Sequence, residues 1–372
     1  MQVIQGGTAS RRASQRPQIK GVDYVELYVG NARQAAHFYR TTFGFTPVAY
    51  ADFETGARDQ VSFVLQQGDM RLILTGPTSP DSPIARHVHF HGDSVKNIAF
   101  VVDDVEQTFE ASLRRGAQSV AEPVTFEDER GRFSKATIGA YGDTVHSFVQ
   151  RDSPDDFYFP QYNQITKAPF SIPTGVKTLD HVAVSIEEGR LDEWVEFYQR
   201  VLGFHESHQE NVESEYSAMN SKVVQNSTGS VKFPLVCPAP SKRKSQIEEY
   251  LSFHRGPGVQ HLAFLSNDII DTVRTVRAGA IDFLHPPDAY YEMLEDRIGP
   301  IDYDIETLRE LDILVDRDAD GYLMQIFTKP LDNRPTMFVE IIQRIGSQGF
   351  GGGNIKSLFQ AVEREQALRG NL

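Results

Sequence analysis

The chain has 372 residues, 40% hydrophobic and 24% charged, which is ordinary for a soluble globular protein of about two domains. Its formal charge of -14 argues against nucleic acid or an anionic membrane as a partner. The single cysteine, Cys237, excludes an intramolecular disulfide framework and fits a cytoplasmic protein, and we interpret it as a small buried apolar residue. Without a run of about 18 apolar residues, we expect no transmembrane helix.

Composition also suggests where the domains begin and end. Residues 1–20 are polar and lack the apolar region of a signal peptide, so we expect a disordered leader. Residues 153–173 are rich in Pro, Asp, Tyr and Phe and are typical of an interdomain linker. We therefore expect a first domain over 21–152 and a second over 174–372.

Hydrophobic periodicity predicts two similar units in the first domain. A strand at 22–29 is followed by a helix at 31–42 that ends at Gly44, and then by strands at 60–66 and 71–75. A second strand at 96–102 precedes a helix at 104–115 and strands at about 135–139 and 144–150.

The second domain repeats this order. A strand at 178–186, a helix at 190–202 and strands at 217–225 and 230–235 come first. A strand at 260–266, a helix at 268–278 and a strand at 322–328 follow, and a helix at 354–367 ends the chain. Four β-α-β-β-β units, two per domain, predict an α+β protein of two tandem open β-barrels. Such cups can hold a metal and a small ligand, and the last helix can close one of them.

The two domains form an imperfect internal repeat. Three matches define it: residues 23–25 with 180–182, 95–100 with 259–264, and 146–148 with 325–327. Each copy must rebuild the same packed unit, so differences between the copies mark where chemistry was added. Tyr24 corresponds to His181 and Asn97 to His261, which predicts a metal site in the second half only.

Glu340 is the third candidate ligand. It lies in the otherwise apolar run 337–342, where an ionised carboxylate is costly unless a cation compensates it. Two histidines and one carboxylate suit iron, zinc or manganese and leave positions open for substrate and oxygen. Taken singly, each residue also fits a structural role: a strand histidine packed in the core, or a glutamate in a salt bridge.

A competing cluster consists of His87, His89 and His91, at alternate positions before Gly92 and Asp93. Because this stretch is polar, we expect a solvated loop there and no metal site.

Several motifs together resemble the 4-hydroxyphenylpyruvate dioxygenase family, which includes the related 4-hydroxymandelate synthases. They lie at 179–181, 256–261, 323–330, 338–344 and 349–354, and the resemblance extends from about residue 20 to the C-terminus. It implies a vicinal-oxygen-chelate fold in which only the C-terminal barrel is active, in agreement with the repeat.

The resemblance also implies the chemistry. Fe(II) would be held by His181, His261 and Glu340, and 4-hydroxyphenylpyruvate would chelate it through its own 2-oxo acid, so that only O2 is needed as a second substrate. Gln246, Gln260, Gln325 and Ser221 would bind or orient substrate, although a glutamine can equally be a solvated surface residue. Further substrate-binding positions are Phe327, Phe350, Asn354 and Phe359.

Two positions depart from the dioxygenase pattern. Ile355 follows Asn354 where that pattern has Phe, and Val236 replaces an Asn. Both changes resemble hydroxymandelate synthases, as does 218–221, whereas Pro234, Phe359 and the segment 364–372 are more similar to the dioxygenases. We expect benzylic hydroxylation to 4-hydroxymandelate and CO2, with ring hydroxylation to homogentisate, as in tyrosine breakdown, as the alternative.

Two other classes of protein remain open from the sequence. A repeat-built cup can sequester a ligand without chemistry, as the first half is expected to do. A zinc hydrolase with the same three ligands would act without oxygen. The family commonly associates through its inactive half, so the resemblance also implies a homo-oligomer.

Overall fold

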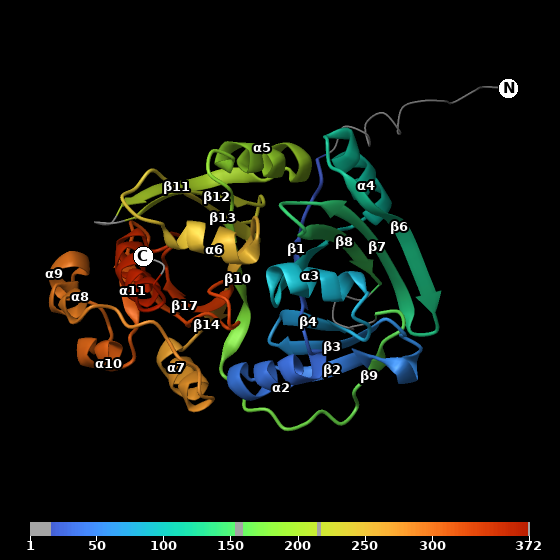
Figure 1. Ribbon diagram of the computed structural model, residues 1–372, viewed down its shortest axis with the longest axis horizontal. Helices are drawn as coiled ribbons and strands as arrows, with labels where there is room; N and C mark the ends of the chain where they lie inside the picture. The colour runs from blue at the N-terminus through green and yellow to red at the C-terminus, as the bar shows by residue number, and fades with distance from the viewer. Residues whose placement is uncertain (1–15, 153–158, 214–216, 371–372) are drawn as a thin grey trace.

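The computed structural model describes residues 16–152, 159–213 and 217–370 (Figure 1). Most of the expected leader, residues 1–15, lies outside this range. Of the remaining leader residues, Pro17 and Ile19 are buried, whereas Arg16, Gln18 and Lys20 are exposed. Ile19 is 6% exposed within the main core, and its carbonyl oxygen accepts a hydrogen bond of 3.0 Å from Asn226 in the second half. An apolar residue close to the first strand is therefore used as part of the core.

The first half is one nine-stranded sheet, in which two β-α-β-β-β units supply eight strands and a short later strand supplies the ninth. The first unit contains β1 (Gly21–Tyr28), α2 (Ala32–Phe43), β2 (Thr46–Ala51), β3 (Gln60–Gln67) and β4 (Met70–Pro77). A helix, α3 (Pro83–His91), leads to the second unit, which contains β5 (Ser94–Val101), α4 (Val105–Arg114), β6 (Ser119–Asp128), β7 (Gly131–Gly139) and β8 (Val145–Arg151).

The second half repeats this plan in an eight-stranded sheet. Its third unit contains β10 (Val176–Ser185), α5 (Leu191–Leu202), β11 (His205–Glu213), β12 (Ala218–Gln225) and β13 (Lys232–Pro238). After α6 (Gln246–His254), the fourth unit contains β14 (Gly258–Ser266), α7 (Ile269–Ala278), β15 (Leu314–Arg317), β16 (Tyr322–Phe327) and β17 (Phe338–Ile345). Three short helices, α8 (Asp288–Glu292), α9 (Leu294–Ile298) and α10 (Ile305–Glu310), are inserted before β15.

Equivalent strands occupy equivalent places in the two sheets. β1 pairs with β5 and β10 with β14, both antiparallel, at the centre of each sheet. β8 lies parallel to β5 and β17 parallel to β14, and the last helix, α11 (Gly352–Leu368), packs beside β11 and β15. The predicted α+β fold of tandem curved sheets is confirmed. None of the described helices is both long and apolar enough to cross a membrane.

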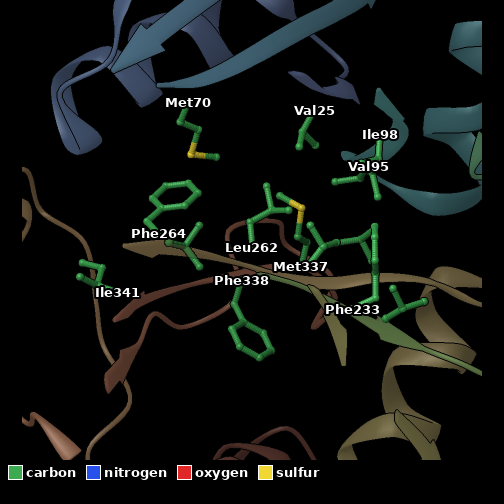
Figure 2. Packing of buried hydrophobic residues seen from close by; sticks show 14 of the residues in the cluster. Val25, Met70, Val95, Ile98, Phe233, Leu262, Phe264, Met337, Phe338 and Ile341 are labelled. Carbon is green, nitrogen blue, oxygen red and sulfur yellow. The ribbon is translucent and has the colours of Figure 1, made fainter. Parts of the chain in front are cut away.

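The two sheets share one apolar core. Val25, Met70 and Ile98 from the first half face Leu262 and Phe264 from the second (Figure 2). Phe338 projects to the opposite side of the second sheet, away from the first half (Figure 2). Burying these faces against each other holds the halves in a fixed relation, because burial removes apolar surface from water at about 25 cal/mol per Å².

Four strands of the repeated units were not predicted from the sequence: β2, β15 and the polar edge strands β6 and β11. The strands β6 and β11 are polar and largely exposed, because each forms an outer edge of its sheet, and they lack the alternation that marks a half-buried strand. Part of the expected linker is also structural rather than a free connection. β9 (Asn163–Gln164) pairs with β2, and Phe159 and the buried Tyr162 pack inside the first sheet.

The strand registers correct the third sequence match. Asn97 pairs with Val145, and His261, its counterpart, pairs with Phe338. Residues 146–148 on β8 therefore correspond to 339–341 on β17, and not to 325–327 as the local sequence suggested. By this register the first-half counterpart of Glu340 is Ser147.

Candidate metal centre

Three neighbouring strands bring His181, His261 and Glu340 together inside the second cup; we call them the triad. Strand alternation explains their direction. On β10, His181 and Ala183 line the cavity, whereas Val182 and Val184 belong to the core shared with the first half. On β14 and β17, the core neighbours of His261 and Glu340 are the apolar residues Leu262, Phe264, Val339 and Ile341.

The triad atoms meet at close range. His181 Nε2 and His261 Nε2 each lie 3.2 Å from Glu340 Oε2, and the two nitrogens are 3.4 Å apart. The Glu340 side chain is 1% exposed, and those of His181 and His261 are 3% and 12% exposed. These residues form one of two groups in the described parts of the chain whose geometry could hold a metal ion.

Hydrogen bonds indicate that His181 and His261 both carry a proton on Nδ1, the ring nitrogen that does not face Glu340. Asp180 Oδ1 accepts from His181 Nδ1 at 2.8 Å, and Gln260 Oε1 accepts from His261 Nδ1 at 3.3 Å. In the neutral tautomers this leaves lone pairs on both Nε2 atoms, facing the Glu340 carboxylate. Lone pairs that converge in this way repel each other unless a cation lies between them, so the donor set fits a divalent metal.

The pKa shifts of the triad also indicate that the site attracts positive charge. Burial alone would raise the pKa of Glu340, but His181 and His261 lower it to about 2. Burial lowers the pKa of His261, whereas the charge of Glu340 raises that of His181 despite burial. The negative charge therefore draws a proton to His181, in the place where a metal ion would supply the positive charge.

A hydrogen-bond chain behind the triad holds the ligands in place. Arg344 donates to both oxygens of Asp180, at 2.7 and 2.8 Å. Gln325 Nε2 donates to Glu340 Oε1 at 2.8 Å, and its own Oε1 accepts from Asn354 at 2.9 Å. Asn354 is 0% exposed, so it acts through Gln325 and does not line the cavity as we expected of a substrate-binding residue.

Most of the other expected site residues surround the same cavity. They are Ser221, Val236, Gln246, Gln260, Gln325, Phe327, Phe350 and Ile355. Phe359 is the exception, because it packs with Met219, Val236 and Ile247 in an apolar cluster behind the wall. Its neighbour Leu358 faces the cavity instead. A helix rotates by about 100° per residue, so only the observed orientation of α11 decides between the two.

The sequence reading missed His208 and Glu210, which also line the cavity. Both come from the polar edge strand β11, and His208 Nε2 lies 3.1 Å from Glu210 Oε1. The available signal was their spacing of two, which places both side chains on the same face of a strand.

Comparisons with known proteins found similar sequences and a similar structure. The family model described as Glyoxalase/Bleomycin resistance protein/Dioxygenase superfamily matches residues 21–136 and 178–326. A 4-hydroxyphenylpyruvate dioxygenase of Yarrowia lipolytica is 41% identical over 95% of this chain and 94% of that protein. One of Aspergillus fumigatus is 42% identical over 97% of this chain and 96% of that protein.

A solved structure is similar over nearly the whole chain. It is a triple mutant of 4-hydroxymandelate synthase from Streptomyces coelicolor, 38% identical, with a TM-score of 0.85. The match covers 95% of this chain and 100% of that one. Known relatives of this chain thus carry the names of both a dioxygenase and a synthase.

Proposed function

The chain belongs to the 4-hydroxyphenylpyruvate dioxygenase and 4-hydroxymandelate synthase family, and from this membership we propose that it oxidatively decarboxylates 4-hydroxyphenylpyruvate. The expected reaction consumes O2, releases CO2 and hydroxylates the benzylic carbon to give 4-hydroxymandelate. The observation that carries the proposal is the buried triad, open on one side to a cavity with an apolar wall.

The proposed metal is Fe(II), held by His181, His261 and Glu340. Two histidines and one carboxylate with open positions are the donor set of non-haem Fe(II) oxygenases. Bound there, Fe(II) would supply the redox chemistry that activates O2 and would polarise the substrate's 2-oxo acid.

The chain's own residues bind and orient the substrate. Gln246 and Gln260 line the cavity, where an amide group can hydrogen-bond the polar ends of the substrate. Phe327 and Phe350 supply apolar surface on which its ring can pack. Ile355 and Leu358, on α11, cover the cavity and help to exclude water.

The product depends on which carbon of the substrate is presented to the metal. Ile355 packs against the apolar cluster that contains Val236, so both departures from the dioxygenase pattern lie in the same wall. A branched Ile in place of a planar ring lets the substrate ring tilt and brings the benzylic carbon forward. Val236 removes an amide that could hold a polar group. A misplacement of about 1 Å can change a rate roughly a hundredfold, so two wall residues suffice to redirect the outcome.

Product analysis tests this proposal. The full chain is loaded with Fe(II), supplied with 4-hydroxyphenylpyruvate and O2, and its products are separated by chromatography. We expect 4-hydroxymandelate as the main product; homogentisate alone would disprove the synthase assignment, and O2-independent turnover would disprove the dioxygenase. We expect Ile355→Phe to raise the share of homogentisate about tenfold, since such discrimination rests on a few kcal/mol. Leu358→Phe adds bulk at another cavity-lining position of the same helix, so a smaller shift toward homogentisate in this variant would show that position 355 in particular steers the product.

Homogentisate formation is the second candidate. It is supported by the name of the relatives at 41% and 42% identity, 4-hydroxyphenylpyruvate dioxygenase. The same chromatogram separates the two candidates, because their products are isomers with different retention.

A further inference from the structure

The histidines that we expected in a solvated loop lie instead on a helix, α3, at the seam between the two halves. His87 and His91 are one helical turn apart and are 6% and 7% exposed. One ring nitrogen of each and a carboxylate oxygen of Asp143 all lie within 4.8 Å of one another. We call His87, His91 and Asp143 the seam cluster. The expectation of a loop was wrong because Ser82 caps a helix that begins at Pro83.

The proton positions of His87 follow from its neighbours. Ser94 Oγ donates to the Gly92 carbonyl at 3.3 Å, so it accepts from His87 Nε2 at 3.0 Å. His87 Nδ1 is then the nitrogen with the lone pair. This atom is buried and has no hydrogen-bond partner among the described residues. A buried acceptor without a partner costs about 1–3 kcal/mol, unless something outside the chain satisfies it.

The proton positions of His91 follow in the same way. A backbone carbonyl can only accept, so His91 Nδ1 donates to the His254 oxygen at 2.6 Å. The other nitrogen, Nε2, lies 2.9 Å from Asp143 Oδ2. In the neutral ring this places a lone pair against a carboxylate, which is unfavourable without a cation. A metal-binding histidine commonly donates its second ring nitrogen to a backbone carbonyl in this manner.

From this geometry we infer a second metal site, in which His87, His91 and Asp143 bind a divalent transition-metal ion of the Zn²⁺ class. Two imidazoles four residues apart on one helix face and a carboxylate are a common zinc donor set, with water as a fourth ligand. The Asp143 side chain is 64% exposed, which gives the ion a path from solvent.

The position of the site suggests a structural role. Through the His91 hydrogen bond, the ion would tie α3 and the turn before β8 to the last turn of α6. The first residue of α6, Gln246, lines the active cavity, and β14 with His261 follows α6. Packing at the seam is close, since a Cβ on Gly142 would lie 2.6 Å from the Pro257 carbonyl oxygen. An ion at the seam cluster would stabilise the junction without touching substrate.

Zn²⁺ binding to the chelator-stripped full chain tests the inference. Because the triad also accepts Zn²⁺, we expect two equivalents per wild-type chain and one in His181→Ala, measured by calorimetry and metal analysis. In the His181→Ala background, Zn²⁺ should still raise the melting temperature. Adding Asp143→Asn should abolish both the remaining equivalent and the thermal shift. Asp143 is exposed, so this variant is expected to fold.

His89→Ala is the matched control, because His89 lies on the same helix but is exposed and outside the cluster. It should leave both equivalents in place, whereas His87→Ala should remove one. Loss of all Zn²⁺ binding in His181→Ala would disprove the site, as would no thermal shift in that variant. Either result would mean that His91 and Asp143 form only an ion pair. The outcome is independent of the proposed enzyme activity, since no turnover is measured.

Discussion

The two halves of the chain build the same sheet around different interiors. The registers equate Tyr24 with His181, Asn97 with His261 and Ser147 with Glu340. In the first half, Asn97 Nδ2 lies 3.3 Å from the Tyr24 hydroxyl, in the same relation as the two histidines of the triad. The same strand positions therefore bring the first two side chains into contact in both halves, but among the described residues only the second-half set forms a group that could hold a metal.

The first half carries its own positive charge in this place. Lys135 occupies the register position of Gln325, and its Nζ lies 5.7 Å from the centre of the Tyr24 ring. Burial alone would lower the pKa of Lys135, but Tyr24 and Glu26 raise it, so the ammonium stays charged. A positive charge fixed to the chain therefore lies beside Tyr24, the counterpart of the first histidine of the triad. Phe159 and Tyr162 pack into the same interior and leave the first cup filled.

An acid–arginine pair is common to both halves. Asp23 is held by Arg151 as Asp180 is held by Arg344. Asp23 binds a second cation, Arg71, whereas Asp180 accepts from His181. The pair belongs to the shared scaffold, and the second half uses it in addition to orient a ligand. The difference between the halves is thus a small number of interior side chains on a common frame.

The largest effect is expected from substitutions at equivalent positions of the two halves. His181→Ala removes a ligand, so we expect loss of bound iron and a fall in turnover of roughly a thousandfold or more. Tyr24→Phe changes the equivalent position in the first half and should leave iron content and turnover unchanged. Metal analysis and O2 uptake measure both. If the two variants had the same iron content and turnover, the hypothesis that only the second half binds the metal would be wrong.

A smaller effect is expected from Asp180, which accepts a hydrogen bond from the ligand His181. Asp180→Asn keeps an acceptor for His181 but loses the charge that faces Arg344, so metal affinity should fall about 10- to 100-fold. Asp23→Asn should weaken stability and leave metal affinity unchanged. Competition with a chelator of known affinity measures both variants. Equal metal affinities for Asp180→Asn and wild type would show that the Asp180–Arg344 pair stabilises the fold but does not affect metal binding.

The last prediction concerns stability at the seam and changes neither metal binding nor turnover. His146 of β8 lies 2.8 Å from the Tyr198 hydroxyl of α5, and burial lowers its pKa to about 3. Between pH 6.5 and about 3 the unfolded chain binds a proton that the folded chain does not, so stability falls as the pH falls, by roughly 1.4 kcal/mol per unit from this group. His87 and His254 act in the same direction, since burial lowers their pKa values to about 3 and about 4.

His146→Gln retains a partner for Tyr198 and removes the titration, so its stability should fall less steeply with acid than that of the wild type. Urea unfolding from pH 7 to 4 measures the slopes. His89→Gln, at an exposed position, is the control and should follow the wild type. An unchanged slope in His146→Gln would show that His146 is not held neutral at the seam.

The sequence alone determined the unit order and the identity of the triad. Apolar alternation marks strands that are buried on at least one face, so the central strands were predicted. The polar edge strands β6 and β11 and the short strands β2 and β15 were not. His181, His261 and Glu340 stood out because each breaks either the repeat or an apolar run. Pocket residues from β11, such as His208, gave no comparable signal.

Only the tertiary structure decided which distant positions are equivalent and which meet. Local similarity matched residues 146–148 to 325–327, but pairing with the neighbouring strand matches them to 339–341. The periodicity of α11 could not distinguish Phe359 from Leu358 as the residue facing the cavity. His87, His91 and Asp143 meet because a capped helix and a turn 52 residues beyond His91 are packed at the seam. Such contacts depend on strand register and on the packing of one half against the other, and neither is encoded by local periodicity.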